Sequence, residues 1–161
     1  MRKLFFSLCL LCLSIAAKAQ FEQGKWIVNP SITGLDFSYS SHEGVNFGVS
    51  GQVGAFLIDN TALLVAVGGD WSKPANSYNT SVGGRYYFQT TGIYLGAGLK
   101  MKHWKTKSSG SVTNFGAFAE TGYAFFITKT ITLEPAIYYD LSFKDSTYSK
   151  FGLKVGFGLY F

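Results

Sequence analysis

The two histidines are the side chains in this 161-residue chain best suited to acid–base or metal chemistry. His42 precedes Glu43 and follows Ser40 and Ser41, so a general base stands near serine hydroxyls. His103 has no serine or carboxylate beside it in the sequence. A hydrolase needs its base held against the nucleophile, and a metal centre needs several clustered ligands. The pattern therefore predicts no catalytic residue and no metal site.

Glycines and cysteines supply no cofactor site either. Gly96 and Gly98 do not lie between a strand and a helix, as a phosphate-binding loop requires. Cys9 and Cys12 lie in an N-terminal segment that we expect to be removed, which leaves the mature chain without a thiol. We therefore expect no cofactor and no enzymatic activity.

The N-terminal segment has the three parts of a secretory signal peptide. Arg2 and Lys3 are followed by an apolar run, and the small residues Ala17 and Ala19 flank Lys18 at a cleavage site. The apolar run is short for a membrane-spanning helix, which needs about 20 residues. We predict cleavage after Ala19, so that residues 1–19 are a signal peptide and residues 20–161 form one domain. Cleavage lowers the basic count from 14 to 11 against 9 acidic residues, and nothing in this balance suggests a nucleic-acid partner.

The remaining chemistry lies in charged side chains that alternate with apolar ones. In the stretch FGLKVGFGLYF at residues 151–161, every second residue is aliphatic or aromatic, and Lys154 and Tyr160 stand on the other face with glycines. Such a strand suits a barrel that turns one face to lipid and the other to a polar interior. The same pattern predicts strands at residues 25–39, 45–58, 61–71, 78–88, 93–104, 113–127, 131–143 and 151–161.

Details of the strands refine this prediction. A change of face near Thr33 and Gly34 predicts a β-bulge, and Asp59-Asn60 predicts a tight turn. Residues 20–24 are expected to be a disordered lead-in. Connections after the odd-numbered strands are the longer ones, which predicts that they face outward and that both chain ends lie in the periplasm.

Charged residues fall on the face opposite the aliphatic side chains. A basic side chain facing lipid at the middle of a bilayer costs roughly 2–4 kcal/mol, so these residues are expected inside. Unpaired charge in a narrow interior is costly as well, so we predict a polar network of ion pairs. Its expected members are Asp36, Asp70, Arg85, Lys100, Lys102, Glu120, Glu134, Asp140 and Lys154.

Small and bulky residues share the same inner face. Glycines on it make room for large side chains, among them Tyr87, Tyr94 and Phe118. We therefore predict a filled barrel without an open aqueous pore. Aromatic residues are expected to form two girdles at the strand ends: Trp26, Phe88, Phe125 and Phe161 near the periplasm, and Tyr39, Trp71, Tyr78 and Phe143 near the outer surface.

These features resemble the small eight-stranded OmpA/OmpX-like outer-membrane barrels. The likeness lies in the signal peptide, the alternating strands, the terminal Phe161, and the segment VGAFLIDNTALLV, which resembles barrels of the "porin family" of Bacteroidetes-type Gram-negative bacteria. The fold class expected is all-β, an eight-stranded antiparallel up-and-down transmembrane β-barrel. The resemblance implies insertion by the outer-membrane barrel assembly machinery, which reads the closing strand with Phe157, Leu159 and Phe161.

The expected function is that of a monomeric, integral outer-membrane protein with a structural or surface-interaction role. Its expected partners are outer-membrane lipids and lipopolysaccharide. Lysines in or beside the outer loops could contact the phosphates of lipopolysaccharide, and these are Lys73, Lys105, Lys107, Lys144 and Lys150. Three alternatives remain open: a lipid A-modifying barrel enzyme, a narrow channel, and a secreted lipocalin-like binder of apolar ligands. The last would need apolar residues inside and polar residues outside.

Overall fold

A computed structural model describes residues 21–33, 47–71, 75–89, 91–106, 111–144 and 149–161. The expected signal peptide, the bulge near Gly34, and the positions of Asp36 and His42 lie outside these residues. Within them, no helix is long and apolar enough to cross a membrane.

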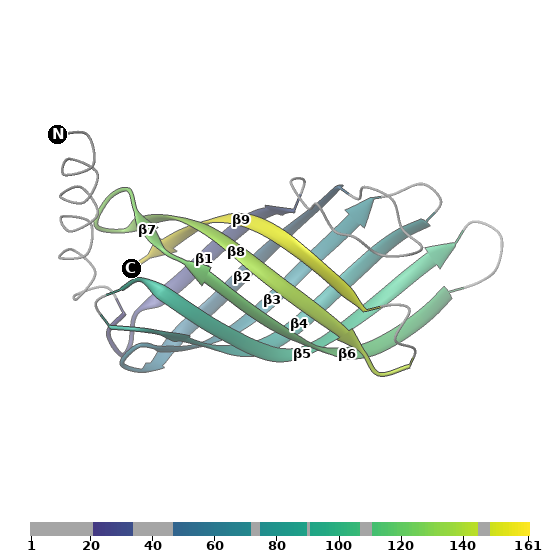
Figure 1. Cartoon of the computed structure of the whole chain (residues 1–161), viewed down its shortest axis with the longest axis horizontal. Helices are drawn as coiled ribbons and strands as arrows, with labels where there is room; N and C mark the ends of the chain where they lie inside the picture. The colour runs from purple at the N-terminus through teal and green to yellow at the C-terminus, as the bar shows by residue number, and fades with distance from the viewer. Residues whose placement is uncertain (1–20, 34–46, 72–74, 90, 107–110, 145–148) are drawn as a thin grey trace, which may run out of the picture.

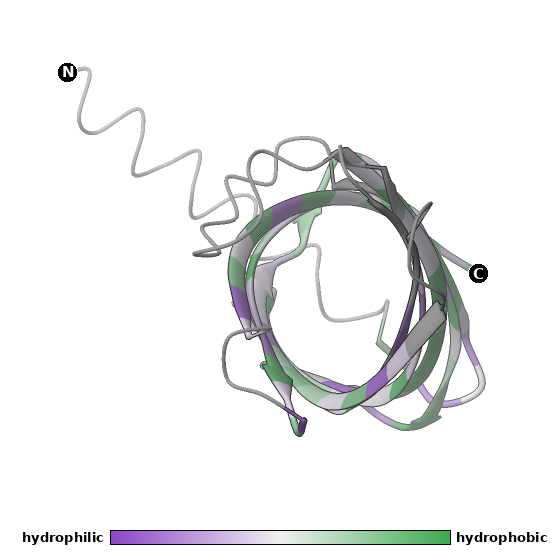
Figure 2. Cartoon of the chain, turned by 90° about the vertical axis from the view of Figure 1, so that its right-hand side faces the viewer, coloured by the Kyte–Doolittle hydropathy of each residue, from purple (hydrophilic) through white to green (hydrophobic). Residues whose placement is uncertain are grey.

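The described residues form antiparallel strands, and each strand pairs with its neighbours in the chain except that β6 and the short β7 both pair with β8 (Figure 1). The first strand, β1, also pairs with the last, β9, and β6 pairs with β8, so the sheet closes on itself (Figure 2). The strands are β1 (Trp26–Thr33), β2 (Phe47–Ile58), β3 (Thr61–Trp71), β4 (Ala75–Tyr87), β5 (Ile93–Thr106), β6 (Ser111–Tyr123), β7 (Phe125–Phe126), β8 (Ile131–Ser142) and β9 (Lys150–Tyr160).

The short strand β7 continues β6 after an interruption at Ala124. Gly122 faces Ala136 and Phe125 faces Leu133, so both pieces keep one register against β8. The sequence predicted an unbroken strand, and this detail was wrong. In that register Pro135 lies opposite Tyr123, and proline has no amide to donate to the ladder. Counting β6 and β7 together, the molecule is the predicted closed barrel of eight antiparallel strands.

The bounds of β3 agree with the expected ones. β4 begins at Ala75 instead of Tyr78, and β5 continues to Thr106 instead of ending at Trp104. Asn60 closes the predicted tight turn between β2 and β3 with a positive φ of 62°. The backbone groups of Trp26 and Phe161 bond to each other at 2.9 and 3.1 Å, so the β1 and β9 ends lie together.

We call this side of the barrel the turn end, because it holds the connections β2–β3, β4–β5 and β7–β8. The opposite side is the loop end. Exposed aromatic residues lie on the outer surface at both ends, as the girdle prediction requires. At the turn end these are Trp26, Phe88, Phe125 and Phe161, and at the loop end they include Tyr78 and Phe143, whereas the predicted Tyr39 and the side chain of Trp71 lie outside the described part.

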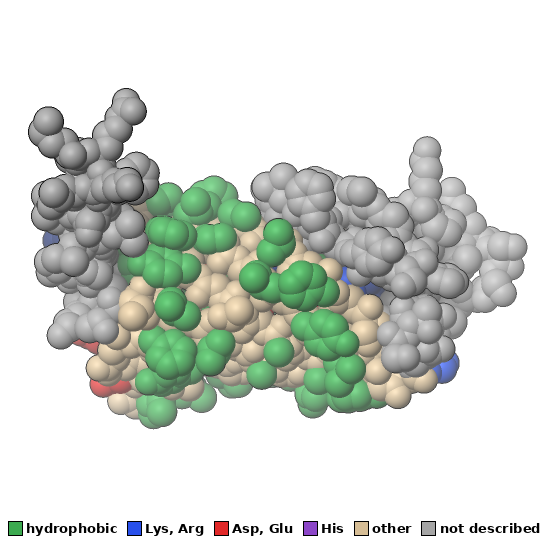
Figure 3. Space-filling model, in the orientation of Figure 1, with side chains coloured by type: hydrophobic (Ala, Val, Ile, Leu, Met, Phe, Trp, Pro, Cys, Tyr) green, Lys and Arg blue, Asp and Glu red, His purple; other side chains and the backbone are tan. Residues whose placement is uncertain are grey.

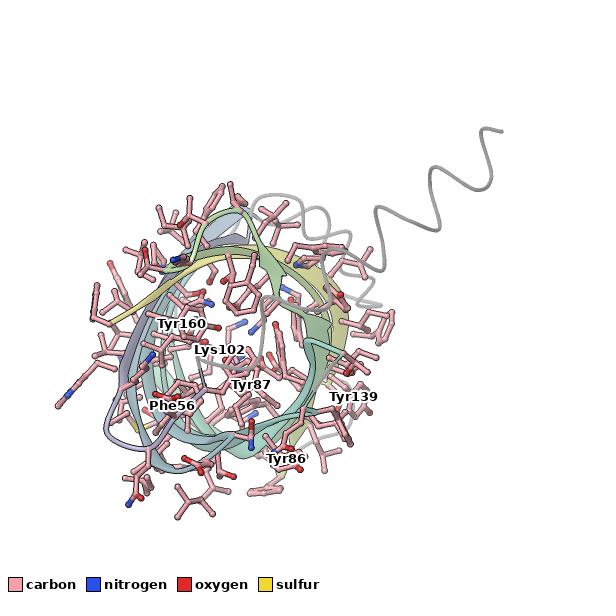
Figure 4. The ribbon with its side chains drawn as sticks, turned by 90° about the vertical axis from the view of Figure 1, so that its left-hand side faces the viewer. Phe56, Tyr86, Tyr87, Lys102, Tyr139 and Tyr160 are labelled. Carbon is pink, nitrogen blue, oxygen red and sulfur yellow. The ribbon has the colours of Figure 1, made fainter. Side chains whose placement is uncertain are left out.

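The two faces of the sheet differ in the way the alternation predicts. Large apolar side chains are exposed on the outer surface, where they are spread over the strands (Figure 3). Tyr86 and Tyr139 point outward, whereas Phe56, Tyr87 and Tyr160 point into the barrel (Figure 4). Val65 is 51% exposed and the adjacent Leu64 is 6% exposed, so neighbouring residues meet different surroundings.

Glycines on the inner face give room to bulky neighbours. A Cβ on Gly83 would lie 2.7 Å from the ring of Phe118, and one on Gly98 would meet the same ring. A Cβ on Gly152 would lie 2.6 Å from the hydroxyl oxygen of Tyr138. These contacts confirm that the glycines and large rings share the interior. They explain how eight strands enclose large residues without strain.

Candidate functional site

Arg85 is the centre of an ion network inside the barrel. β4 directs its side chain inward, where it is 1% exposed. Its Nη2 atom lies 2.6 Å from Oε1 of Glu120, and its Nη1 atom lies 3.0 Å from Oε2 of Glu134. The guanidinium therefore bridges two carboxylates that come from β6 and β8.

The remaining donors of Arg85 are also used. Nε donates to Glu120 Oε1 at 3.0 Å, Nη2 donates to Gln52 Oε1 at 2.8 Å, and Nη1 donates to the Tyr87 hydroxyl at 3.2 Å. The Tyr94 ring centroid lies 4.2 Å from the guanidinium carbon, within the range of a cation–π contact. Arg85 thus has both hydrogen-bond acceptors and an aromatic face around it.

Glu134 has further donors besides Arg85. Asn29 Nδ2 donates to Oε2 at 2.6 Å, Thr132 Oγ1 donates to Oε1 at 2.7 Å, and the Tyr160 hydroxyl donates to Oε1 at 2.5 Å. Lys154 forms an ion pair with Glu120. Each buried carboxylate therefore meets several donors, which offsets the cost of removing its charge from water.

A second ion pair lies nearer the loop end. Lys100 Nζ lies 2.6 Å from Asp140 Oδ2, and it also lies 5.7 Å from the centroid of the Tyr138 ring. These side chains are more exposed than the Arg85 network, at 22% for Lys100 and 18% for Asp140. The Lys100–Asp140 pair is therefore less completely enclosed than the Arg85 network.

A small chamber of about 60 Å³ lies among these charged side chains. Lys102 and Lys150 line it together with the Lys100–Asp140 pair and Lys154, and Figure 4 shows Lys102 inside the barrel. Lys150 was expected beside the outer loops and lies there, but its side chain does not face the outer surface, as a contact with lipopolysaccharide phosphates would require. β9 begins at Lys150, and the alternation along β9 turns this side chain, which is 6% exposed, into the interior. Lys144 is exposed, as the prediction required.

The structure brings most of the predicted network residues together. Arg85, Glu120, Glu134 and Lys154 form one cluster, Lys100 and Asp140 form a pair, and Lys102 lines the chamber. Asp70 belongs to β3, but its side chain is outside the described part, and Asp36 is outside it altogether.

The charge pattern did not identify the neutral partners of the network. Asn29, Thr132 and Tyr160 donate to Glu134, and Gln52 accepts from Arg85. The signal that could have found them is the phase of the strands, because all four alternate with outward apolar residues. Their chemical partners still depend on which strands lie across the barrel, and one sequence does not show this.

An aromatic cluster closes the turn end below the ion network. Phe56, Tyr87, Tyr160 and Phe126 come from four different strands, and Phe21 packs against all of them. Residues 20–24 were expected to be a disordered lead-in. This expectation was wrong for Phe21, which is 4% exposed, because an aromatic ring gains more by packing on other rings than by staying in water.

His103, the histidine within the described residues, adds no second site. His103 Nδ1 lies 2.9 Å from the hydroxyl of Thr113 on the neighbouring strand, and both are on the outer face. In the described ranges, no three His, Cys, Asp or Glu residues come close enough to hold a metal ion. The chemistry that the described interior supports directly is therefore ion pairing and hydrogen bonding.

Comparison with known proteins supports the fold at low sequence identity. No protein-family model and no curated protein matches the chain. Among solved structures, the N-terminal β-barrel domain of Pseudomonas aeruginosa OprF is similar, with a TM-score of 0.69 and 18% identity over 86% of this chain and 98% of that one.

Two further solved structures are similar to this chain in fold. Neisserial surface protein A has a TM-score of 0.63 and 16% identity over 85% of this chain and 95% of its own. The outer membrane protein Ail of Yersinia pestis has a TM-score of 0.58 and 11% identity over 86% and 100% of the two chains. The chain therefore has the fold of the small eight-stranded outer-membrane barrels, as the sequence resemblance implied.

Proposed function

We propose that the chain is an integral outer-membrane protein with a structural or surface-interaction role, a filled interior and no open pore. The observation that carries this proposal is the opposite polarity of the two faces. Large apolar side chains such as Leu63, Val67 and Leu99 are 45–60% exposed on the outside, whereas Arg85 and Glu134 are each 1% exposed on the inside.

This polarity would be costly for a barrel surrounded by water. Burial of apolar area gains about 25 cal/mol per Å², and the exposed outer side chains obtain this gain only from an apolar medium. A secreted binder of apolar ligands would reverse the pattern, with an apolar cavity and a polar outer surface. The ion network occupies the place of such a cavity here.

The filled interior supports a role without free passage of solutes. The Arg85 network spans the barrel between β4, β6 and β8, and the aromatic cluster lies between this network and the turn end. The chamber of about 60 Å³ is small for a path through the protein. A narrow channel would need these layers to separate.

The expected partners follow from the surface. Outer-membrane lipids would meet the apolar side chains, and lipopolysaccharide phosphates would meet lysines at the loop end, of which Lys144 is described and exposed. The assembly machinery would recognise the closing strand, where Phe157 and Phe161 are exposed and Leu159 is partly so. We propose a monomer, because one chain closes its own barrel without leaving an edge strand.

Fractionation of a Gram-negative host that expresses the full chain tests the membrane assignment. We expect the protein in the outer-membrane fraction, with faster gel migration of the unheated sample than of the boiled one. Recovery in the soluble periplasm would contradict the proposal.

Two further measurements separate the proposed role from its alternatives. In planar bilayers we expect no sustained conductance, and a steady conductance would support the narrow channel. Mass spectrometry should find the same lipid A with and without the protein, whereas a changed acyl pattern would support a lipid A-modifying enzyme.

A further inference from the structure

Residues 21–25, which we call the strap, fold across the turn end before β1 begins. The Phe21 carbonyl accepts a hydrogen bond from the Asn60 amide at 2.7 Å, and the Gly24 amide donates to the Phe56 carbonyl at 2.9 Å. The Phe56 amide in turn donates to the carbonyl of Lys25 at 2.9 Å. These bonds fix the strap to the end of β2 and to the β2–β3 turn.

Two details show that the strap is a defined turn. Gly24 has a φ of +86°, a conformation that glycine adopts readily and other residues adopt at a cost. The amide of Gln23 donates to the Asp59 side chain at 2.9 Å. The turn directs the chain so that the side chain of Phe21 enters the barrel.

The ring of Phe21 lies among four rings of the barrel wall. It stacks on Tyr87 with a centroid distance of 4.2 Å and an interplanar angle of 19°. Its centroid lies 5.9 Å from that of Phe56, 5.6 Å from that of Phe126 and 5.7 Å from that of Tyr160. Figure 4 shows Phe56, Tyr87 and Tyr160 pointing inward at this end.

The groups behind this ring belong to the ion network. The hydroxyls of Tyr87 and Tyr160 lie 3.2 Å apart and reach Arg85 and Glu134. Tyr87 is 0% exposed and Tyr160 is 2% exposed, although both lie near the open end of the strand barrel. The Phe21 ring, which stacks on Tyr87 and meets Tyr160 edge-on at the barrel mouth, accounts for their isolation from water.

We propose that the strap is a seal: Phe21 plugs the turn end and keeps water and small solutes from the Arg85 network on that side. The exposure of the groups behind the plug supports this, because Arg85 is 1% exposed and Tyr87 is 0% exposed. The inference concerns the folded chain and holds whether or not the proposed physiological role is correct.

Thiol labelling tests the seal, because the mature chain is expected to contain no cysteine. Ala62 is 0% exposed and belongs to the same buried cluster as Phe21, so Ala62→Cys places a small probe behind the plug. The full chain is expressed, purified in detergent and treated with a charged methanethiosulfonate. The unchanged chain, treated in parallel, gives the background.

In the Ala62→Cys chain we expect almost no labelling beyond this background. Adding Phe21→Ala should raise the labelling rate at least tenfold, whereas adding Trp26→Ala should leave it low. Trp26 is the matched control, since it is an aromatic residue at the same end that lies 56% exposed on the outer face. Fast labelling with Phe21 intact would overturn the proposal, as would slow labelling in a folded Phe21→Ala chain.

Hydrogen exchange tests the seal without any substitution, in case the Phe21→Ala chain does not fold. The Asn60 amide donates to the strap carbonyl of Phe21, so a seated strap protects it. We expect this amide to exchange at least a hundredfold more slowly than a free peptide. Exchange at the free-peptide rate would show an unseated strap and would overturn the proposal.

Discussion

Replacement of Arg85 by methionine is the most informative single substitution in the interior. Arg85, Lys154, Glu120 and Glu134 together carry no net charge, so Arg85→Met leaves one uncompensated negative charge in the buried cluster. Methionine keeps an unbranched apolar side chain and removes every donor. The variant therefore tests the ion network with little change in the shape of the side chain.

The expected loss of stability follows from the contacts. Arg85 donates hydrogen bonds to Glu120, Glu134, Gln52 and Tyr87, and its side chain is 1% exposed. Breaking a buried pair by removing one partner costs about 3–5 kcal/mol, because the other charge remains without compensation. Domains are typically stable by about 5–15 kcal/mol, so this loss is a large part of the total.

Urea titration of the protein in lipid vesicles measures this loss, with the unheated gel band as the readout of the folded barrel. Lys25→Met is the control, because its ion pair with Glu22 lies at the surface, where the two side chains are 34% and 60% exposed, and its loss should cost no more than about 1 kcal/mol. Adding Glu134→Gln to Arg85→Met makes the cluster neutral again, because Lys154 and Glu120 remain as an ion pair, and should recover more than half of the loss. A stability of Arg85→Met within about 0.5 kcal/mol of the original chain would refute the reasoning.

Three further substitutions test other parts of the account. Val65→Arg places a charge on the outer face, where Val65 is 51% exposed, and should lower the free energy of unfolding in vesicles by about 2–4 kcal/mol. Gly98→Ala should destabilise by about 1–3 kcal/mol or more in the same titration, because its Cβ would lie 2.5 Å from Gly83 Cα. Deletion of Phe161 should reduce the folded protein recovered from outer membranes, measured by the unheated gel band, because the assembly machinery is proposed to read this end.

The controls for these substitutions are available in the same chain. Gly51→Ala should be neutral or stabilise by up to about 1 kcal/mol, because nothing lies within 4 Å of its added Cβ. Equal losses at Gly51 and Gly98 would contradict the role assigned to inner glycines. An unchanged stability of Val65→Arg would contradict the lipid-facing assignment, and unchanged recovery without Phe161 would remove the proposed assembly signal.

The strand pattern predicted the barrel well because one simple physical rule acts along every strand. Apolar and polar positions alternate with a period of two, so the phase of a few residues fixes the face of the others. This is why Val82 was correctly placed outside and Arg85 inside. The break at Ala124 lies next to Tyr123, which faces Pro135 on β8, and proline has no amide to donate to the ladder. Pairing across strands is not visible in the sequence of one of them.

The errors concern residues at the ends of strands and before the first one. Lys150 directly precedes the expected closing strand, and a shift of one residue at a strand boundary changes a loop residue into an inward one. Phe21 has no neighbours that show a period, so alternation could not place it. Its position depends on rings from β2, β4, β7 and β9, which meet only when the barrel closes.

Contacts between methyl groups and lipid test the central claim most directly. Leu63 and Leu64 are adjacent residues of the same type on β3, with exposures of 45% and 6%. In lipid nanodiscs, NMR cross-relaxation should connect the methyl groups of Leu63 to the acyl-chain methylenes and should show no such signal for Leu64. Signals from Leu64 to lipid, with Leu63 silent, would show that the barrel is turned the other way and would contradict the account.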